Sequence, residues 1–269
     1  MADADGFLAP GSGLVLGRRA NARAALLDAL LDARAAALGE GARLDRAAVR
    51  APRRRVLVLA VQRTDVPNLL EATRYELARS RHDVTVATRE AGTAGKFANL
   101  DALLVDQPAE EHDWLLVVDD DVALPPRFLD RFLVVCERFA FTLAQPAHRH
   151  RSHAAWPLTR RRPDVARVTR FVEIGPVTAF HYDAFAALLP FPPLRMGWGL
   201  DAHWAAIARD QGWRVGIVDA TPIRHGLRRT ASGYANADAV AEARAFLADR
   251  PYLSGPELTE TLATYRSWR

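Results

Sequence analysis

The chain has 269 residues, of which 49% are hydrophobic and 25% charged, which suits a globular protein of one large or two small domains. A net charge of +4 is too small to indicate nucleic-acid binding by itself, and no apolar run approaches the ~20 residues of a membrane span. Residues 1–13 lack the order of a signal peptide, and the single cysteine, Cys136, cannot form an internal disulfide. These features favour a cytoplasmic protein.

Arginine replaces lysine almost everywhere in this sequence. The two residue types number 36 together, and Lys96 is the single lysine. Coding bias in a GC-rich genome explains most of this pattern. Against that background, Lys96 hints at a position that needs a compact ammonium group.

The first part of the chain is predicted to be helical. Residues 1–52 are rich in Ala, Arg and Leu, and strong helix formers fill the segment 20–38. We expect an N-terminal helical extension over residues 1–52 that packs on the main domain or on a partner. If the protein is a homodimer, this helix is the expected place of the contact.

Strands and helices are predicted to alternate after residue 52. Short apolar segments predict buried strands at 56–61, 83–88 and 114–118. Helices are predicted at 65–80, 95–105 and 127–139. This alternation predicts an α/β fold with a mostly parallel sheet, in which ligands bind at the carboxyl ends of the strands.

The second half of the sequence is less regular. Histidine and arginine clusters at 148–153 and 160–162 flank a predicted loop. The remaining predicted elements are a strand at 171–180 interrupted by Gly175-Pro176, a helix from about Asp201 to 211, a strand at 214–218 and a helix at 237–247. We place the main domain at 53–253 and a C-terminal tail at 254–269.

Asp119, Asp120 and Asp121 directly follow the apolar segment 114–118. In an extended chain, the side chains of Asp119 and Asp121 face the same side. Carboxylates crowded at a buried strand end raise one another's pKa unless a cation neutralises them. A divalent ion bound through oxygen would do so, whereas an exposed acidic turn is the simpler alternative. The buried strand before the triplet favours the metal site.

Three further residues allow a structural or a functional interpretation. Asp201 precedes a helix, where an aspartate caps the N-terminus but is also held rigidly enough for catalysis. His225 follows a short strand, and a lone histidine is more often structural than a ligand. Trp198 stands between Gly197 and Gly199, so its ring either belongs to the core or offers an apolar face to a sugar.

Taken in order, these segments resemble a GT-A glycosyltransferase. The resemblance rests on Lys96 with Asn99, the Asp119-Asp120-Asp121 triplet, Gly197-Trp198-Gly199 with Asp201, and Ile223-Arg224-His225. The Gly-Trp-Gly-x-acid and Ile-Arg-His elements are similar to those of animal beta-galactosyltransferases, and the Lys-x-x-Asn-Leu helix resembles family-two glycosyltransferases. The resemblance covers about residues 53–235. It implies a GT-A (Rossmann-like) α/β fold with helices on a mostly parallel sheet.

The resemblance also implies roles. Asp121 and His225 would ligate a divalent metal, with Mn²⁺ preferred over Mg²⁺ because one ligand is an imidazole. Asp201 would be the general base of an inverting displacement. The donor would be a nucleotide-sugar, expected to be UDP-linked, and the acceptor a glycan, a glycolipid or a small molecule. Contacts to the donor are expected from Gln62, Arg63, Thr64, Lys96, Asp119 and Asp120, and contacts to the substrate from Gly175, Trp198 and Gly199.

Two departures from the galactosyltransferase pattern bear on these roles. Asp201 is followed by Ala202 and His203 instead of further acids, which leaves open that Asp201 positions the acceptor instead of acting as the base. Pro222 stands where those enzymes use a methionine ligand, so the metal would have fewer protein ligands.

Other functions were weighed against this one. A haloacid dehalogenase-type phosphohydrolase needs a lysine after its DxD, and none follows Lys96. A nucleotidyltransferase shares the fold and metal use but has no need of the Gly-Trp-Gly loop. A non-catalytic sugar-nucleotide or glycan-binding module would keep Trp198 and the aspartates. The basic loop 148–162 would either contact an anionic, lipid-linked acceptor at a membrane surface or be a solvated loop.

Overall fold

The structure, a computed structural model, describes residues 6–7, 17–228 and 235–268. Its strands are β1 (Arg55–Gln62), β2 (Asp83–Glu90), β3 (Trp114–Val118), β4 (Val122–Ala123), β5 (Leu143–His148), β6 (Ala166–Thr169), β7 (Val177–His181), β8 (Val215–His225) and β9 (Thr261–Tyr265). Its α-helices are α1 (Arg18–Ala37), α2 (Glu40–Arg50), α3 (Leu70–Ala78), α4 (Lys96–Asp106), α5 (Phe128–Arg138), α6 (Phe185–Leu188), α7 (Leu200–Asp210), α8 (Asn236–Leu247) and α9 (Gly255–Leu258). Short 3₁₀ turns are η1 (Ala109–Glu111), η2 (Pro157–Thr159) and η3 (Tyr182–Ala184).

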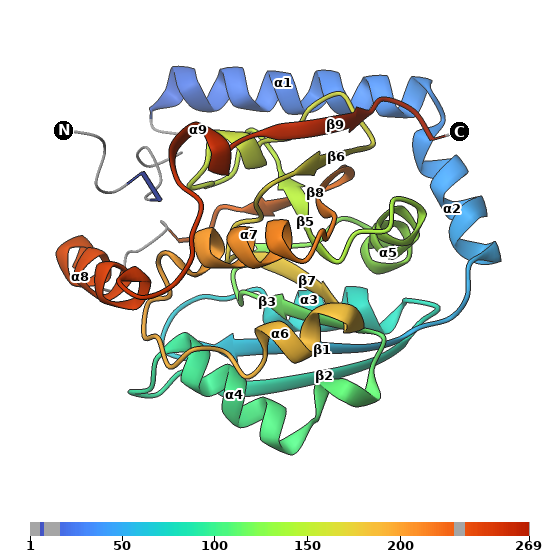
Figure 1. Ribbon diagram of the computed structural model, residues 1–269. Helices are drawn as coiled ribbons and strands as arrows, with labels where there is room; N and C mark the ends of the chain where they lie inside the picture. The colour runs from blue at the N-terminus through green and yellow to red at the C-terminus, as the bar shows by residue number, and fades with distance from the viewer. Residues whose placement is uncertain (1–5, 8–16, 229–234, 269) are drawn as a thin grey trace.

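A single sheet organises the described part of the chain (Figure 1). The strand order is β2-β1-β3-β7-β5-β8-β6-β9, and β4 pairs with β8 beside this path. Only β7 and β6 run against the common direction of the other strands on the path, which follows from the pairing of each neighbour. The α/β class with a mostly parallel sheet flanked by helices is therefore confirmed.

Two hydrophobic cores lie on opposite faces of the sheet. Helices α4, α6, α7 and α8 contribute to one core, and α2, α3 and α5 contribute to the other. Side chains of β1 alternate between them, because successive residues of a strand point to opposite faces: Val56 and Val58 join one core, Leu57 and Leu59 the other. This explains why the first apolar run is uninterrupted by polar residues.

Helix α1 packs on the main domain through polar contacts. The Asp28 carboxylate accepts hydrogen bonds from the backbone N–H groups of His150 (2.8 Å) and Arg151 (2.9 Å). Asp32 forms ion pairs with Arg149 and Arg161. These contacts attach α1 to the loop that follows β5. In the described ranges, no helix combines the length and apolarity needed to cross a bilayer.

Several element limits differ from those predicted. The helix expected at 65–80 begins only at Leu70, because Leu69 N donates to the Asp120 carbonyl (2.6 Å) and Asn68 Oδ1 accepts from Leu70 N (3.2 Å). Within 171–180, the strand is confined to β7. Strand β8 continues beyond the predicted 218 to His225.

No regular element was predicted at strands β4, β5, β6 and β9 or at the short helices α6 and α9. Strands β5 and β6 flank the loop expected near 148–162, whereas α2 follows α1 within the extension that was predicted to be helical. Strand β9 lies in the segment predicted as a tail and pairs with β6 at the sheet edge. The domain limits themselves stay a prediction.

The Arg167–Asp219 ion pair offers a test of this fold. Both side chains are fully buried, with Nε 2.7 Å from Oδ2, and Asp219 also accepts from Arg162 N (2.8 Å). Asp219→Ala should destabilise the protein by about 3–5 kcal/mol, because it leaves a buried guanidinium without its counter-charge. Urea denaturation measures the loss. In the control, Glu257→Ala removes one partner of the half-exposed Arg209 and should change stability by less than about 1 kcal/mol.

Candidate metal and catalytic site

Several of the candidate residues lie at one edge of the sheet. Strands β1, β3, β5 and β8 run in the same direction, so their carboxyl ends meet there. Gln62 ends β1, Asp119 follows β3, His148 ends β5 and His225 ends β8. This is the edge at which α/β sheets bind ligands.

Asp119, Asp121 and His225 form a cluster that can hold a metal ion. Each offers a ligand atom, and these atoms all lie within 4.8 Å of one another. The short strand β4 brings them together, because Val122 pairs with His225 across the β4–β8 ladder. Two carboxylates and an imidazole are a donor set that suits Mn²⁺, so the residues fit the predicted metal.

The charges in the cluster compensate one another. His225 Nε2 lies 3.1 Å from Asp121 Oδ1, and Arg228 Nε lies 3.3 Å from Asp121 Oδ2. Burial acts to raise the pKa of Asp121, but the hydrogen bond and charge of His225, with the charge of Arg228, outweigh it and lower that pKa. Burial acts to lower the pKa of His225, but Asp121 outweighs it and raises that pKa. Asp121 is therefore ionised, with one oxygen facing His225 and the other facing Arg228.

Lys96 lies against Asp119. Its Nζ is 2.6 Å from Asp119 Oδ1 and 3.4 Å from the Ile174 carbonyl oxygen. Gly175 closes this side of the site: a Cβ there would lie 3.0 Å from Asp119 Oδ2 and 3.5 Å from Lys96 Nζ. The structure thus brings Lys96, Asp119 and Gly175 together, and the compact glycine leaves room for the pair.

Asp120 has different surroundings from its two neighbours. It is buried, its Oδ2 accepts from Arg63 N (2.7 Å), and its Oδ1 pairs with Arg228. Its backbone carbonyl receives the Leu69 N–H described above. Both carboxylate oxygens therefore hold protein donors, and the side chain ties the loop after β1 to the end of β3.

The predicted nucleotide-contacting residues after β1 lie at the same edge. Gln62 pairs with Glu90 in the β1–β2 ladder, and Arg63 forms an ion pair with Asp65 (3.0 Å). The Thr64 hydroxyl donates to Glu90. Gln62 and Arg63 are half-buried and Thr64 is exposed.

Asp201 is the second residue of α7 and is buried. Its Oδ1 accepts from Ala202 N (3.0 Å), and the Trp156 side chain also donates a hydrogen bond to it. Burial is the main cause that raises the pKa of Asp201 to about 7, and an ionised Glu173 would contribute to this rise. A carboxyl group with this pKa can accept a proton near neutral pH.

The Gly197-Trp198-Gly199 loop is held in place by a side chain of α8. The carboxylate of Glu242 accepts from the backbone N–H groups of Arg195, Met196 and Gly197 at 2.8–2.9 Å. Gly197 has φ +81°, and a Cβ there would lie 2.0 Å from the Phe97 ring, so no other residue fits. The Trp198 ring is half-buried against the core, not fully approachable.

Four further residues shape the site and were not singled out in the sequence. They are Ser152 and Trp156 in the loop after β5, Glu173 before β7, and Arg228 after β8. Glu173 had a signal that could have been used, since it is an acid inside the apolar run 171–180 that was expected to be a strand. For the other three, no periodicity or spacing distinguishes them from surface residues.

The arginines of the basic loop contact the protein itself. Arg160 donates to the carbonyl oxygens of Arg149 (2.9 Å), His150 (3.1 Å) and Ser152 (2.6 Å). Arg149 and Arg161 pair with Asp32 of α1, as described above. Contact of this loop with a lipid-linked acceptor stays a prediction.

No protein-family model and no curated protein matches this sequence. Among solved structures, the chain is similar to A197 from STIV, with 10% identity over 65% of this chain and 86% of that one. It is similar to GalNAc-T7 with UDP, GalNAc and Mn²⁺ (12% identity, 67% and 44% of the two chains). It is also similar to S. aureus TarS 1-349 in complex with UDP-GlcNAc (10% identity, 67% and 61% of the two chains). The TM-score is 0.44 in each case.

The surroundings of the three aspartates predict different effects of mutation. Asp121→Ala removes a ligand, so it should weaken Mn²⁺ binding by more than the roughly 10–100-fold that loss of an outer partner costs. Asp120→Asn should bind Mn²⁺ within about threefold of wild type, because Asp120 lies outside the cluster and its Oδ2 accepts from Arg63 N. Electron paramagnetic resonance of free Mn²⁺ measures both. Equal losses in the two variants would contradict the assignment of ligands.

Proposed function

We propose that this protein is a metal-dependent glycosyltransferase that moves a sugar from a nucleotide-sugar to an acceptor hydroxyl with inversion. The observation that carries the proposal is the cluster of Asp119, Asp121 and His225 at the carboxyl edge of the sheet. The resemblance of the Gly197-Trp198-Gly199 loop, Asp201 and Ile223-Arg224-His225 to GT-A enzymes supports it.

Asp121 and His225 would hold the metal, with Asp119 as a third donor or as a contact to the ribose or a metal-bound water. Mn²⁺ is preferred because an imidazole joins the oxygen donors, and Mg²⁺ is the alternative. When bound, the ion supplies Lewis-acid stabilisation of the charge on the leaving diphosphate. Lys96, whose ammonium lies at the same edge, adds a positive charge near that group.

Asp201 would act as the general base. Its carboxylate takes the proton of the acceptor hydroxyl while that oxygen attacks the anomeric carbon and the nucleoside diphosphate leaves. A pKa of about 7 keeps part of the population ionised near neutral pH and makes the carboxylate more basic than an exposed aspartate. The burial that raises this pKa also keeps bulk water away from the proton transfer.

The donor is proposed to be a UDP-linked sugar that contacts Gln62, Arg63 and Thr64 beyond β1. The half-buried Trp198, with Gly175 and Gly199, would contact the sugar or the acceptor. A glycan, a glycolipid or a small molecule with a free hydroxyl is the acceptor.

Asp201→Asn tests the proposed base. The amide cannot take a proton, so turnover with a nucleotide-sugar donor should fall by roughly 10²–10⁴-fold while donor binding stays within a few fold. Slow donor hydrolysis in the presence of Mn²⁺ provides the assay before the acceptor is known. Asp210→Asn, an exposed position on the same helix, is the matched control and should leave the rate unchanged. Near-wild-type turnover in Asp201→Asn would remove Asp201 from this role.

Nucleotide-dependent thermal stability tests the donor class. A nucleotide at ~100 times its Kd stabilises the folded protein by about 2.7 kcal/mol, or several degrees of Tm for a chain of this size. UDP should give this shift with Mn²⁺ and a much smaller one without it, and GDP, TDP, CMP and ADP are the comparisons. A shift with none of the five would count against a nucleotide-sugar enzyme.

A further inference from the structure

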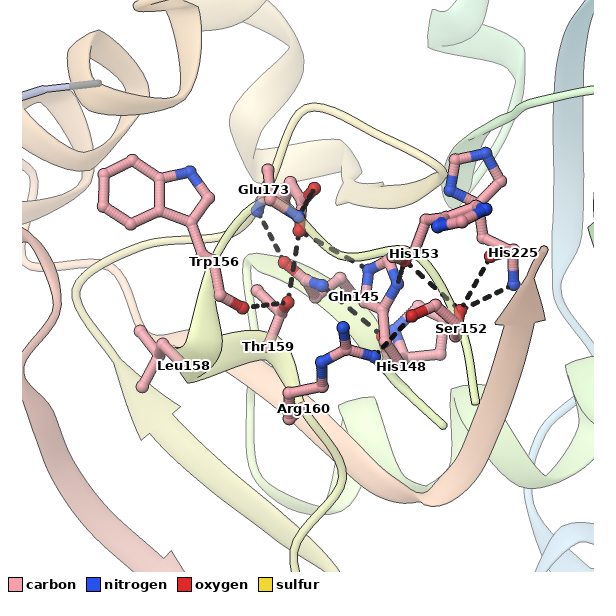
Figure 2. Close-up of polar contacts among 12 residues, drawn as sticks. Gln145, His148, Ser152, His153, Trp156, Leu158, Thr159, Arg160, Glu173 and His225 are labelled. Carbon is pink, nitrogen blue, oxygen red and sulfur yellow. Dashed lines mark hydrogen bonds and ion pairs between the residues drawn. The ribbon is translucent and has the colours of Figure 1, made fainter. Parts of the chain in front are cut away.

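Glu173 is a buried acid that the proposed reaction does not use. It precedes β7, and its side chain is 9% exposed. Its Oε1 accepts from Ala155 N (3.0 Å), while its Oε2 lies 3.1 Å from Thr159 Oγ1 and 3.5 Å from His148 Nε2. Figure 2 shows Glu173 among these side chains, with Gln145 beside it. Its own backbone N–H donates to Gln145 Oε1 (2.5 Å).

The geometry around Oε2 favours a proton on Glu173. The Nδ1 of His148 lies 2.9 Å from the His153 carbonyl oxygen, which can only accept, so Nδ1 carries the ring proton. Nε2 of that ring therefore holds a lone pair; it is buried without a hydrogen-bond partner among the described residues and lies 3.5 Å from Oε2. A protonated Oε2 can point its hydrogen at this lone pair, whereas a carboxylate would face it with a lone pair of its own. The Thr159 hydroxyl can donate to Oε2 (3.1 Å) or to the Trp156 carbonyl (2.9 Å), and either choice is compatible with this proton.

The pKa values of Glu173 and His148 agree with both side chains being uncharged. Burial raises the pKa of Glu173 to about 7, and burial lowers the pKa of His148 to about 3. The charged and titratable groups around Glu173 are His148, Arg160 and His225, with Asp201 on α7. With a proton on Glu173, Asp201 can ionise without a second negative charge beside it.

Glu173 holds the 152–159 segment, which contacts both His225 of the candidate metal cluster and Asp201. In the 152–159 segment, Ser152 Oγ donates to the His225 carbonyl (3.1 Å) and accepts from His225 N (2.8 Å). The N–H of His153 also donates to the His225 carbonyl (2.6 Å). Further along, the Trp156 side chain binds Asp201. Figure 2 shows Ser152 turned toward His225 at one end of the network and Thr159 toward Glu173 at the other.

We propose that Glu173 is a positioning residue that carries a proton on Oε2 and fastens the 152–159 segment, so that His225 and Asp201 keep their places. The role in placing His225 and Asp201 rests on the function proposed above. The position of the proton does not, because it is argued from the contact between Glu173 and the lone pair of His148.

Infrared spectroscopy of the metal-free protein tests the position of the proton. The difference spectrum between wild type and Glu173→Gln at pH 6 should contain the carbonyl stretch of a protonated carboxylic acid. The exposed Glu110→Gln gives the matched control and should show only a carboxylate band. In nitrogen NMR, His148 should carry a proton on Nδ1 and none on Nε2. A carboxylate band for Glu173 at pH 6 overturns the proposal.

Stability as a function of pH gives a second, independent measurement. An acid with a pKa of about 7 in the folded protein and 4.5 when unfolded binds its proton more tightly when folded. Its stabilising contribution is therefore full below pH 4.5 and is lost as the pH rises to about 7. Across this range the unfolding equilibrium of wild type should rise by up to roughly 300-fold relative to that of Glu173→Gln, since Asp201 and His225 are present in both. Parallel curves for the two proteins overturn the proposal.

Mn²⁺ binding at pH 6 tests the positioning role. Glu173→Gln can donate and accept as the protonated acid does, so it should match wild type within about threefold, whereas Glu173→Ala should bind roughly 10–100-fold more weakly. Wild-type affinity in Glu173→Ala, or equal loss in both variants, overturns the positioning role. If Glu173→Ala does not fold, the spectroscopic and pH measurements on Glu173→Gln still decide the proton. If the wild-type protein shows the carboxylic-acid band but does not bind Mn²⁺, the proposed function is overturned, while the position of the proton on Glu173 is supported.

Discussion

Three consecutive aspartates leave the buried strand β3, and a different part of the chain meets each of them. Lys96 from the start of α4 pairs with Asp119, the N–H of Arg63 and the side chain of Arg228 engage Asp120, and His225 at the end of β8 lies against Asp121. Crowded carboxylates at a low-dielectric strand end need such compensation. The same need for compensating charge explains why three segments meet at this edge: the loop after β1, the start of α4 and the end of β8.

The acidic groups of the site fall into two sets whose pKa values are shifted in opposite directions. Asp121 is kept ionised by the donors that surround it, which suits cation binding. Glu173 and Asp201 lie in drier surroundings that raise their pKa to about 7, which suits holding or taking a proton. The 152–159 segment touches both sets, since it contacts His225 at one end and Glu173 and Asp201 at the other. The segment therefore connects the candidate metal cluster with the two buried acids.

Sequence patterns predicted the regular elements wherever one physical signal dominated. The uninterrupted apolar runs of β1 and β3 are strands, because both faces of the sheet are covered. Helices α1, α4 and α7 lie within two residues of their predicted limits, since helix propensity and apolar periodicity act locally. The start of α3 was wrong by five residues, because Leu69 and Asn68 make hydrogen bonds that no local pattern reveals.

The sequence by itself determined the α/β class, the position of the acidic triplet after a buried strand, and the types of residue that could ligate a cation. Tertiary structure decided which aspartates join His225 in the candidate metal cluster and which one accepts from Arg63 N instead. It also decided the surroundings of Glu173, whose partners His148, Ala155 and Thr159 come from other segments. The reason is physical: strand and helix signals depend on neighbours along the chain, whereas pairing of charges and burial of a proton depend on groups that only folding brings within a few ångströms.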